Sequence, residues 1–264
     1  MNKTRVWFIT GAARGFGRLF AESALASGDS VVGTARQPGR LEDLHARYGG
    51  RLVSLPLDVR DRAAVFAAVE VAADAFGRLD IVINNAGYGL TGAVEEIAED
   101  AAREIIDTNF FGVLWACQAV APHLRAQRSG HIVQMSSIAG LTGIATQGLY
   151  AASKFAVEGM SESLAHELES FGVIVTLVEP GAHATGFSLR FAEFTDAYQP
   201  VRAALMERYA DATLGDPARV VEAVMAVVNS PKPPRRLLLG SEYSMITDLY
   251  RQRLDDWEAW REIS

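Results

Sequence analysis

The sequence predicts an α/β fold in which one doubly wound parallel sheet of about seven strands carries helices on both faces. Short apolar runs of strand length alternate along the chain with longer segments in which apolar residues recur at helical spacing. This alternation of strand and helix requires a parallel sheet with right-handed crossover connections. The expected strands are residues 6–10, 30–35, 51–55, 80–84, 131–135, 173–178 and 237–239.

The segments between these strands predict helices. A helical pattern follows the glycines after the first strand, and no repeat or linker divides the chain, so residues 1–264 are expected to form a single domain. A last helix, at about residues 242–261, carries apolar residues that we expect to cover the chain's own core, with a subunit contact as the less favoured alternative. Further helices are expected at residues 60–76, 99–127, 150–171 and from about 216 onward.

An aromatic and apolar insertion at about residues 186–214 follows the sixth expected strand. Segments that leave the carboxyl edge of a parallel sheet often carry binding residues or close over a substrate. We therefore expect a substrate lid here. A pair of helices packed on the core is the alternative that the sequence leaves open.

Composition argues against several classes of protein. The net charge is −7, whereas a general nucleic-acid binder normally presents a basic surface. No apolar run approaches the roughly 18 residues that a membrane-spanning helix needs, and the run at residues 6–9 is too short for a signal peptide. The single cysteine, Cys117, permits no internal disulfide, so we expect a reducing, cytoplasmic location and a packing role for Cys117. We expect no metal site.

A glycine-rich segment directly follows the first expected strand and opens a helical pattern. Strand, glycines and helix in this order form the context of a phosphate-binding turn, because glycines let a pyrophosphate approach the amides at the helix N-terminus. The spacing is Gly-x-x-x-Gly-x-Gly rather than the more familiar Gly-x-Gly-x-x-Gly, so a plain turn is the alternative. The candidate residues are Gly11, Arg14, Gly15, Phe16 and Gly17.

The end of the second expected strand favours one dinucleotide over the other. Folds that bind NAD place an acidic residue about 20 positions past the glycines, where it holds the ribose 2′-hydroxyl. Here the strand ends in Ala35 and Arg36, with no carboxylate to repel a phosphate. Arg36 and Arg14 can both fork onto the 2′-phosphate of NADP(H), which is therefore the expected cofactor, with NAD(H) less favoured. The alternative for each arginine is a solvated surface charge.

Small and polar residues follow the next two strands. Asp58 and Val59 come after the third, where Asp58 is placed either to meet an adenine amino group or to cap the next helix. Asn85, Ala86 and Gly87 follow the fourth, and their small side chains let the backbone come close to a bound ligand.

Asn109 falls in the middle of the helix expected at residues 99–127, among apolar neighbours. A buried amide needs hydrogen-bond partners. Asn109 is therefore either a satisfied core asparagine or part of a site.

Ser137, Tyr150 and Lys154 bring together a hydroxyl, a phenol and an ammonium. Tyr150 and Lys154 are one helical turn apart, so their side chains share a helix face. A free tyrosine titrates near ~10, and a fixed lysine nearby has the sign needed to favour its anion. Ser137 follows a strand's carboxyl end, where open α/β sheets bind ligands. Taken alone, Tyr-x-x-x-Lys is also typical of an exposed helix face.

Together these residues resemble the short-chain dehydrogenase/reductase family over about residues 5–239. The motifs that carry the resemblance occur in family order and are Thr10-Gly11-x-x-x-Gly15-x-Gly17, Asn84-Asn85-Ala86-Gly87, Asn109, Ser137, Tyr150-x-x-x-Lys154 and Pro180-Gly181-x-x-x-Thr185. The resemblance implies a Rossmann-type fold, and it implies a catalytic tetrad formed by Asn109, Ser137, Tyr150 and Lys154.

The resemblance also implies contacts to the cofactor. Residues 180–185, with Pro180, Gly181 and Thr185, are expected at the nicotinamide end, and Lys154 is expected to hold the nicotinamide ribose beside Tyr150. Residues 85–87 are expected to line the cofactor, and Asp58 to meet the adenine.

The implied activity is hydride transfer between NADP(H) and a carbonyl or secondary alcohol. In the reductive direction Tyr150 gives a proton to the developing alkoxide, Ser137 hydrogen-bonds the substrate oxygen, and Asn109 holds a water that relays protons toward Lys154. The apolar lid and the weakly polar span at residues 140–145 favour a hydrophobic ketone, hence a ketoreductase.

Three alternatives stay open at this point: an NAD-dependent alcohol dehydrogenase, a redox-neutral enzyme such as an epimerase, and a non-catalytic dinucleotide-binding sensor. The resemblance further implies a homodimer or homotetramer through the two long helices.

Overall fold

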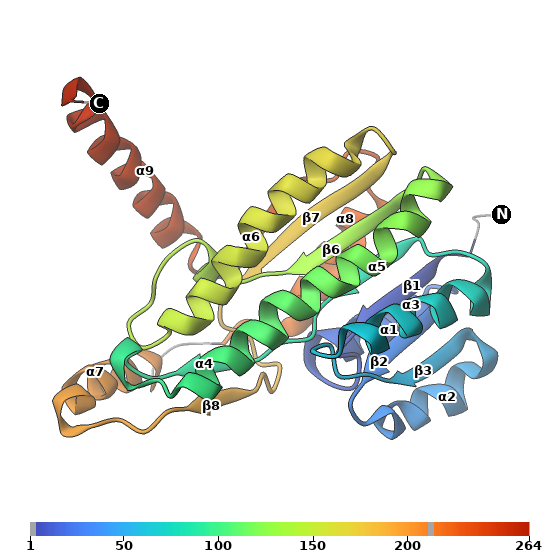
Figure 1. Cartoon of the computed structure of the whole chain (residues 1–264), viewed down its shortest axis with the longest axis horizontal. Helices are drawn as coiled ribbons and strands as arrows, with labels where there is room; N and C mark the ends of the chain where they lie inside the picture. Colours follow the sequence, from blue (N-terminus) through green and yellow to red (C-terminus); the bar gives the residue numbers. More distant parts are fainter. Residues whose placement is uncertain (1–3, 211–213, 264) are drawn as a thin grey trace.

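The computed structural model describes residues 4–210 and 214–263, and its centre is a seven-stranded parallel sheet in the order β3-β2-β1-β4-β6-β7-β9 (Figure 1). Each neighbouring pair is parallel. The predicted doubly wound sheet is confirmed. Its strands are β1 (Val6–Thr10), β2 (Ser30–Ala35), β3 (Leu52–Pro56), β4 (Ile81–Asn84), β6 (Gly130–Met135), β7 (Val173–Pro180) and β9 (Arg236–Leu239).

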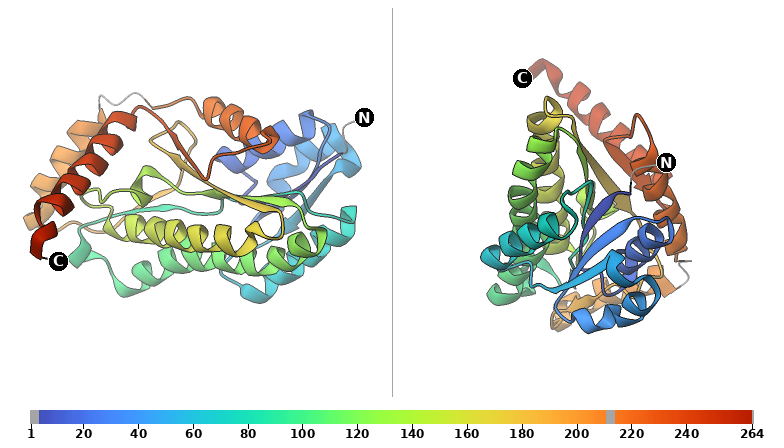
Figure 2. Two further views of the ribbon diagram at one scale, coloured as in Figure 1. Left: turned by 90° about the horizontal axis from the view of Figure 1, so that it is seen from above. Right: turned by 90° about the vertical axis from the view of Figure 1, so that its right-hand side faces the viewer.

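Helices cover both faces of this sheet, as Figure 2 shows edge-on. One face carries α1 (Gly15–Ala26), α2 (Glu42–Tyr48) and α8 (Pro217–Asn229). The other carries α3 (Arg62–Phe76), α5 (Gly112–Gln127) and α6 (Gly148–Glu169). The sequence analysis did not anticipate α2. Short 3₁₀ turns lie at Pro38–Leu41, Gly49–Arg51, Val94–Glu96, Ile138–Gly140, Asp196–Tyr198 and Arg261–Ile263.

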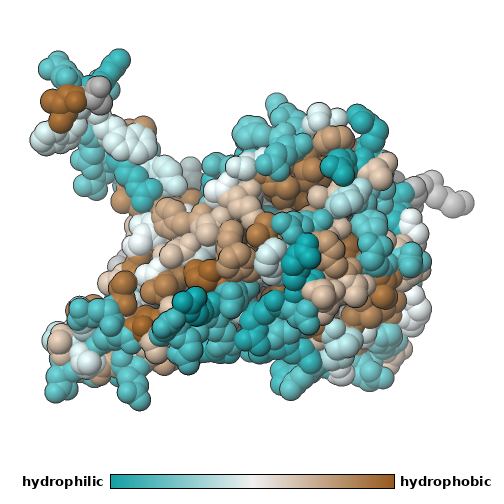
Figure 3. Space-filling model, in the orientation of Figure 1, coloured by the Kyte–Doolittle hydropathy of each residue, from teal (hydrophilic) through white to brown (hydrophobic). Residues whose placement is uncertain are grey.

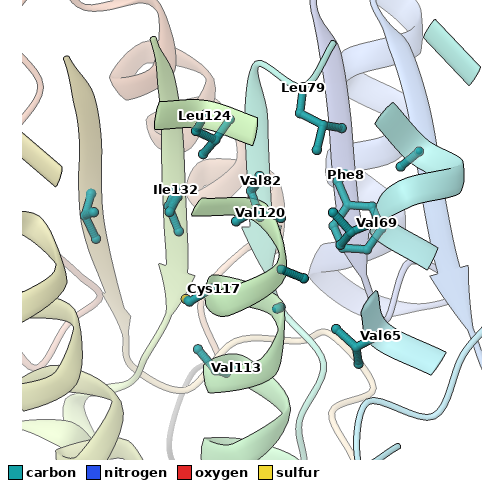
Figure 4. Packing of buried hydrophobic residues seen from close by; sticks show 14 of the residues in the cluster. Phe8, Val65, Val69, Leu79, Val82, Val113, Cys117, Val120, Leu124 and Ile132 are labelled. Carbon is teal, nitrogen blue, oxygen red and sulfur yellow. The ribbon is translucent and has the colours of Figure 1, made fainter. Parts of the chain in front are cut away.

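The core lies in two layers because successive side chains of a strand point to opposite faces. In β1, Val6 and Phe8 join the layer under α3 and α5, whereas Trp7 and Ile9 pack under α1. All of β1 is buried, as expected for a central parallel strand. Figure 4 shows the first layer, where Phe8 packs against Val69.

The long helix predicted at residues 99–127 is interrupted. The chain forms α4 (Glu99–Ile106), one π turn (Asp107–Phe111) and then α5. A π turn widens the helix by one residue and often occurs at functional sites. Here it carries Asn109, so the interruption decides where that side chain points.

The predicted lid contains a strand and a helix. β8 (Leu189–Phe191) pairs in parallel with β5 (Gly89–Thr91), a short strand that the sequence analysis did not anticipate. The helix α7 (Gln199–Ala210) follows, and residues 211–213 of the expected lid lie outside the described residues.

The expectation that the last helix covers the chain's own core is wrong for most of its length. In α9 (Tyr243–Ala259) only Ile246 is buried, whereas Tyr250, Leu254 and Trp257 are exposed, Trp257 by 69%. Figure 1 shows the reason: beyond its first turns α9 projects away from the body of the molecule. Helical spacing shows that apolar residues lie on one face of a helix, but it does not show whether that face packs against another part of the protein.

Within the ranges 4–210 and 214–263, no helix combines the length and the apolarity that crossing a bilayer demands.

The exposure of α9 predicts how the protein tolerates truncation. A chain that ends at Arg253 loses exposed side chains, so its midpoint of thermal unfolding should change by less than about 2 °C. Leu124→Ala, at a fully buried position of α5, should instead cost about 2–5 kcal/mol of unfolding free energy. Calorimetry of both variants checks this, and a truncation that destabilises as much as Leu124→Ala contradicts the observed exposure.

Candidate active site

Consecutive strands of the sheet bring the candidate residues to one edge. Gly11, Asn85, Ser136 and Gly181 directly follow the carboxyl ends of β1, β4, β6 and β7, which are neighbours in this order. The chain runs from β1 outward to β2 on one side, while β4 lies on the other side. Open α/β sheets bind ligands in the crevice at such a reversal.

The glycine-rich turn is fixed by close backbone approach. Gly11 and Gly15 have φ angles of +69° and +55°, which glycine adopts without steric cost. A Cβ on Gly17 would come within 2.5 Å of the Asn85 side-chain nitrogen and would also collide with the Gly11 carbonyl. The turn therefore lies directly against the residues that follow β4.

Thr10 joins the glycine turn to the segment after β4, a role that the sequence analysis missed. Its hydroxyl accepts hydrogen bonds from the backbone amides of Asn85 and Ala86, both at 3.0 Å. The Asn85 side-chain amide donates to the carbonyls of Thr10 (3.0 Å) and Gly11 (3.2 Å). The available signal was a hydroxyl at the last position of an otherwise apolar strand.

The two arginines expected to read a phosphate lie at neighbouring strand ends. Arg14 is the N-cap residue of α1 after β1, and Arg36 follows β2. Both are exposed, and among the described residues neither forms an ion pair. Phe16 packs its ring against Phe20 and His183.

Asp58 does not cap the following helix. Asp61 caps α3 by accepting from the amide of Ala64 at 3.0 Å. The carboxylate of Asp58 instead accepts from the Arg60 guanidinium at 3.0 Å, and that hydrogen bond lowers the Asp58 pKa. The Val59 side chain is buried in the core, where it packs against Gly112.

Lys154 is buried at the centre of the site, with 6% of its surface exposed. Its ammonium donates to the carbonyl of Met135, the last residue of β6, at 2.7 Å. The same nitrogen lies 5.8 Å from the ring centre of Tyr150. The predicted pairing of Tyr150 and Lys154 on one helix face is thus present in α6, but Lys154 points into the protein.

Asn109 is fully buried, and hydrogen bonds satisfy its amide. Its oxygen accepts from the Tyr88 amide at 3.0 Å, and its nitrogen donates to the Tyr88 carbonyl and the Ser153 hydroxyl. Ser153 in turn donates to the carbonyl of Tyr150 at 2.7 Å. A Cβ on Gly87 would meet both the Asn109 oxygen and the Lys154 ammonium. Asn109 therefore lies beside Lys154, and Ser153 is a further link that the sequence analysis missed.

Ser137 completes the cluster from the turn after β6. Its hydroxyl accepts from the amide of Ala139 at 3.2 Å and lies 3.5 Å from the carbonyl of Pro180. It also lies close enough to the phenol of Tyr150 to lower the pKa of that group. The four residues predicted as a tetrad thus converge at the carboxyl ends of β4 and β6.

Burial sets the proton affinities of the central pair. It raises the pKa of Tyr150 to about 12, against an opposing hydrogen bond from Ser137. It lowers the pKa of Lys154 to about 8, against the opposing charge of Glu158. The expected lowering of the Tyr150 pKa by the lysine is not found, because desolvation disfavours the phenolate more strongly.

The segment after β7 lies over the glycine turn. Gly181 donates its amide to the Leu239 carbonyl at 2.8 Å, and the Thr185 carbonyl faces Gly15. The carboxylate of Glu242 fills the space beside Gly181 and accepts from the Ala182 amide at 3.3 Å. No sequence pattern pointed to Glu242.

The lid approaches the phenol. The ring of Phe187 lies 6.0 Å from that of Tyr150, centre to centre. Gly89 faces Phe187 and Leu189, so β5 and β8 meet over this ring pair. Figure 3 shows apolar surface in the hollow between α9 and the lid.

A family model for short chain dehydrogenase matches residues 5–194. The chain belongs to the short-chain dehydrogenase family. This agrees with the expectation from the motifs. Several curated proteins are similar to this chain over most of its length.

Oxidoreductase BOA17 of Botryotinia fuckeliana is 39% identical over 99% of this chain and 98% of its own length. The 3-ketodihydrosphingosine reductase of Bacteroides thetaiotaomicron is 38% identical over 89% of this chain and 88% of its own. Human retinol dehydrogenase 8 is 36% identical over 83% of this chain and 75% of its own. The protein is an oxidoreductase of the short-chain dehydrogenase family.

Solved structures agree with this fold. A short-chain dehydrogenase from Streptomyces avermitilis superposes with a TM-score of 0.94 at 34% identity, covering 100% of this chain and 98% of its own. A short-chain dehydrogenase/reductase from Burkholderia phymatum in complex with NAD gives 0.84 at 27%, covering 97% and 95%. The closed form of a serine dehydrogenase complexed with NADP⁺ gives 0.77 at 29%, covering 89% and 94%. Structural relatives of this short-chain dehydrogenase thus hold either nucleotide.

The contact at Gly17 predicts a position that tolerates no side chain. Gly17→Ala should lower the free energy of unfolding by about 1–3 kcal/mol, because its methyl group meets the Gly11 backbone. Gly50→Ala is the matched control, since a Cβ there meets open space. Denaturant unfolding of both variants tests this, and equal stability of the two would mean that the turn does not approach α1 as described.

Proposed function

We propose that the protein is an NADP(H)-dependent reductase that converts an apolar ketone into a secondary alcohol. The observation that carries the proposal is the convergence of Asn109, Ser137, Tyr150 and Lys154 at the carboxyl edge of the sheet, next to the glycine turn. Membership of the short-chain dehydrogenase family supports chemistry on CH–OH or C=O groups.

The crevice residues fit a dinucleotide. No side chain caps the N-terminus of α1 and its first turn has no acidic residue, so its backbone amides face the crevice as donors for a phosphate. Gly11 and Gly15 keep side chains away from that position. Residues 85–87 and 180–185 are proposed to line the rest of the cofactor. When bound, the cofactor supplies the hydride.

Tyr150 is proposed to be the general acid. Its pKa of about 12 keeps the phenol protonated at neutral pH, so it can donate a proton to an alkoxide as that charge develops. Ser137, whose hydroxyl lies near the phenol, is proposed to hold the same substrate oxygen. The two hydroxyl groups then bracket the position at which negative charge appears.

Lys154 and Asn109 are proposed to act behind the phenol. Lys154 is held by the Met135 carbonyl and puts a positive charge beside the ring of Tyr150. Asn109 uses its amide to fix the Tyr88 backbone and Ser153, which bonds the carbonyl of Tyr150. Asn109 is thus proposed to hold the helix turn that carries the acid, and to order a water for proton exchange with Lys154.

The proposed choice of NADP(H) depends on Arg14 and Arg36. Both guanidinium groups are exposed at the ends of β1 and β2, and among the described residues neither forms an ion pair that would compete with a phosphate, although the charge of Arg36 lowers the pKa of nearby Asp58. Asp58, engaged by Arg60, is proposed to meet the adenine rather than the ribose. Relatives in complex with NAD or NADP⁺ keep an NAD-linked alcohol dehydrogenase as the second candidate.

The proposed substrate is an apolar ketone with a long hydrocarbon part. Phe187 lies against Tyr150, and Leu189 and Phe191 are exposed on the lid strand above it. Apolar side chains that stay in water need a partner, and an apolar substrate is one. Two relatives carry names that refer to long apolar substrates, 3-ketodihydrosphingosine and retinol.

We further propose that a dimer or tetramer forms through α4–α5 and α6, where Phe155 is exposed.

Removal of the phenolic hydroxyl tests the assignment of the acid. Tyr150→Phe should lower turnover of apolar ketones with NADPH by at least ~100-fold and leave NADPH affinity within a few-fold, because only proton donation is lost. Tyr243→Phe, at an exposed tyrosine of α9, should leave both unchanged. Turnover within a few-fold of wild type would sink the assignment. Turnover of small polar ketones alone would overturn the substrate class.

Titration with both nucleotides tests the cofactor. Wild-type protein should bind NADPH more tightly than NADH, and Arg36→Ala should weaken NADPH by about 10-fold or more while NADH changes little. Arg219→Ala, at an exposed arginine on α8, is the control. Nucleotide fluorescence reports both affinities. Tighter NADH in wild type, or an equal loss for both nucleotides in Arg36→Ala, would reverse the cofactor assignment.

A further inference from the structure

A buried charge cluster lies one turn further along α6 than Lys154, near the carboxyl ends of β6 and β7. Glu158 follows Lys154 by one turn of α6 and is 4% exposed, and Glu179 of β7 is 2% exposed. Arg236 of β9 lies between them. Buried carboxylates are rare unless they are paired, so this cluster needs an explanation.

Arg236 joins three carboxylates. One of its terminal nitrogens contacts Glu158 and, at 2.6 Å, Glu179, while the other lies 2.8 Å from Glu162. Glu162 sits on the solvent side of α6, with about half of its side chain exposed. Buried Glu158 and Glu179 therefore share one cation from β9, and the buried ammonium of Lys154 supplies the second positive charge.

Glu158 also reaches the turn that carries Ser137. A Cβ on Gly140 would lie 2.7 Å from the Ser136 hydroxyl and 3.1 Å from Glu158 Oε1, so these two oxygens and Gly140 enclose one small space. Both oxygens are buried without a partner in hydrogen-bond geometry among the described residues. Ser136 precedes Ser137 directly, so the Glu158 carboxylate adjoins the serine turn of the proposed site as well as following Lys154 by one turn of α6.

We infer that Glu158 is a positioning residue for the proposed reaction: held by Arg236, its carboxylate keeps the Lys154 ammonium charged and in place beside Tyr150. The inference depends on the proposed function for its catalytic meaning. The expected effect of Glu158 on the Lys154 pKa does not depend on the proposed function, because it involves only groups of this chain.

The charges around Glu158 support this direction of action. Burial lowers the pKa of Lys154 to about 8, and the charge of Glu158 is the opposing effect that raises it. Burial also raises the Glu158 pKa, while the nearby Ser136 hydroxyl and Arg236 lower it and Glu162 raises it. Glu179, with a pKa of about 7, competes with Glu158 for Arg236. Loss of the Glu158 charge leaves Lys154 with burial alone, so the ammonium loses its proton at lower pH.

A purely structural role is the alternative. Arg236 joins α6, β7 and β9, so the cluster can act as a clamp between these elements. A clamp affects unfolding but does not change the titration of Lys154. The two roles are thus separable by experiment.

The chain offers a direct readout because it contains only three lysines, Lys3, Lys154 and Lys232. In protein labelled with ¹³C at the lysine side chains, Lys154 should titrate near pH 8. Glu158→Gln should move that titration at least about one pH unit lower. Glu162→Gln, which removes the exposed carboxylate on the same arginine, should leave it within about 0.3 unit. Lys3 and Lys232 serve as internal references.

The second readout is the pH profile of kcat/KM for ketone reduction with NADPH. In Glu158→Gln the loss of activity on the alkaline side should begin about one unit lower than in wild type, and in Glu162→Gln at the wild-type pH. An unmoved Lys154 signal overturns the inference. So does a moved signal with an unmoved pH profile, or an equal effect of both variants.

Two further variants keep the outcomes distinct. If Glu158→Gln does not fold, Glu158→Asp provides the test: it withdraws the charge by one methylene and should move the Lys154 titration in the same direction by a smaller amount, and no movement overturns the inference. Tyr150→Phe reports separately on the proposed function. If Tyr150→Phe keeps its turnover, the assignment of Tyr150 as the general acid is wrong. The Lys154 titration then still tests the effect of Glu158 on the lysine.

Discussion

The burial of the Lys154 ammonium is the constraint on which the candidate site depends. A charge taken out of water costs several kcal/mol unless nearby groups replace the lost hydration. Here the Met135 carbonyl accepts its hydrogen bond, and Glu158 supplies the opposing charge. Both contacts require α6 to lie against the end of β6. Because Tyr150 precedes Lys154 by one turn and Ser137 follows Met135 by two residues, the same packing brings the phenol to the serine.

The two ends of the crevice use charge differently. Around β1 and β2 the arginines are exposed. Among the described residues Arg36 forms no ion pair and only a longer-range interaction with Asp58, so its guanidinium stays accessible to a ligand. Around β7 and α6 the carboxylates of Glu158 and Glu179 are buried and already paired with Arg236. Exposed cations suit a phosphate that arrives from solvent, whereas buried, paired charges suit a fixed electrostatic field at a reacting group.

Features that depend on local sequence pattern were predicted from the sequence, whereas features that depend on tertiary contacts were missed. The buried strands were predictable because a central parallel strand is apolar on both faces, as β1 is. The exposed face of α9 was not, because spacing shows that Tyr250 and Trp257 share a face but not that the helix leaves the body. The candidate site residues could be selected by motif and order, and the structure brings Asn109, Ser137, Tyr150 and Lys154 together. Their contacts could not be predicted, because groups such as the Arg236 cluster join elements that are far apart in the chain. The π turn at Asn109 was not expected either, and Asp61 rather than Asp58 caps α3.

The proton affinities bear on the direction in which the proposed reaction runs most readily. At neutral pH a phenol with a pKa of about 12 is protonated and an ammonium with a pKa of about 8 is mostly charged. Reduction of a ketone needs a proton donor beside a cation, which is the state that Tyr150 and Lys154 already hold. Oxidation of an alcohol instead needs a base, and the raised pKa of Tyr150 opposes that role at neutral pH. Lys154 loses its proton more easily than Tyr150, so alkaline conditions first remove the cation that supports the phenol. Tyr150 and Lys154 therefore start in the protonation states that the proposed reduction requires.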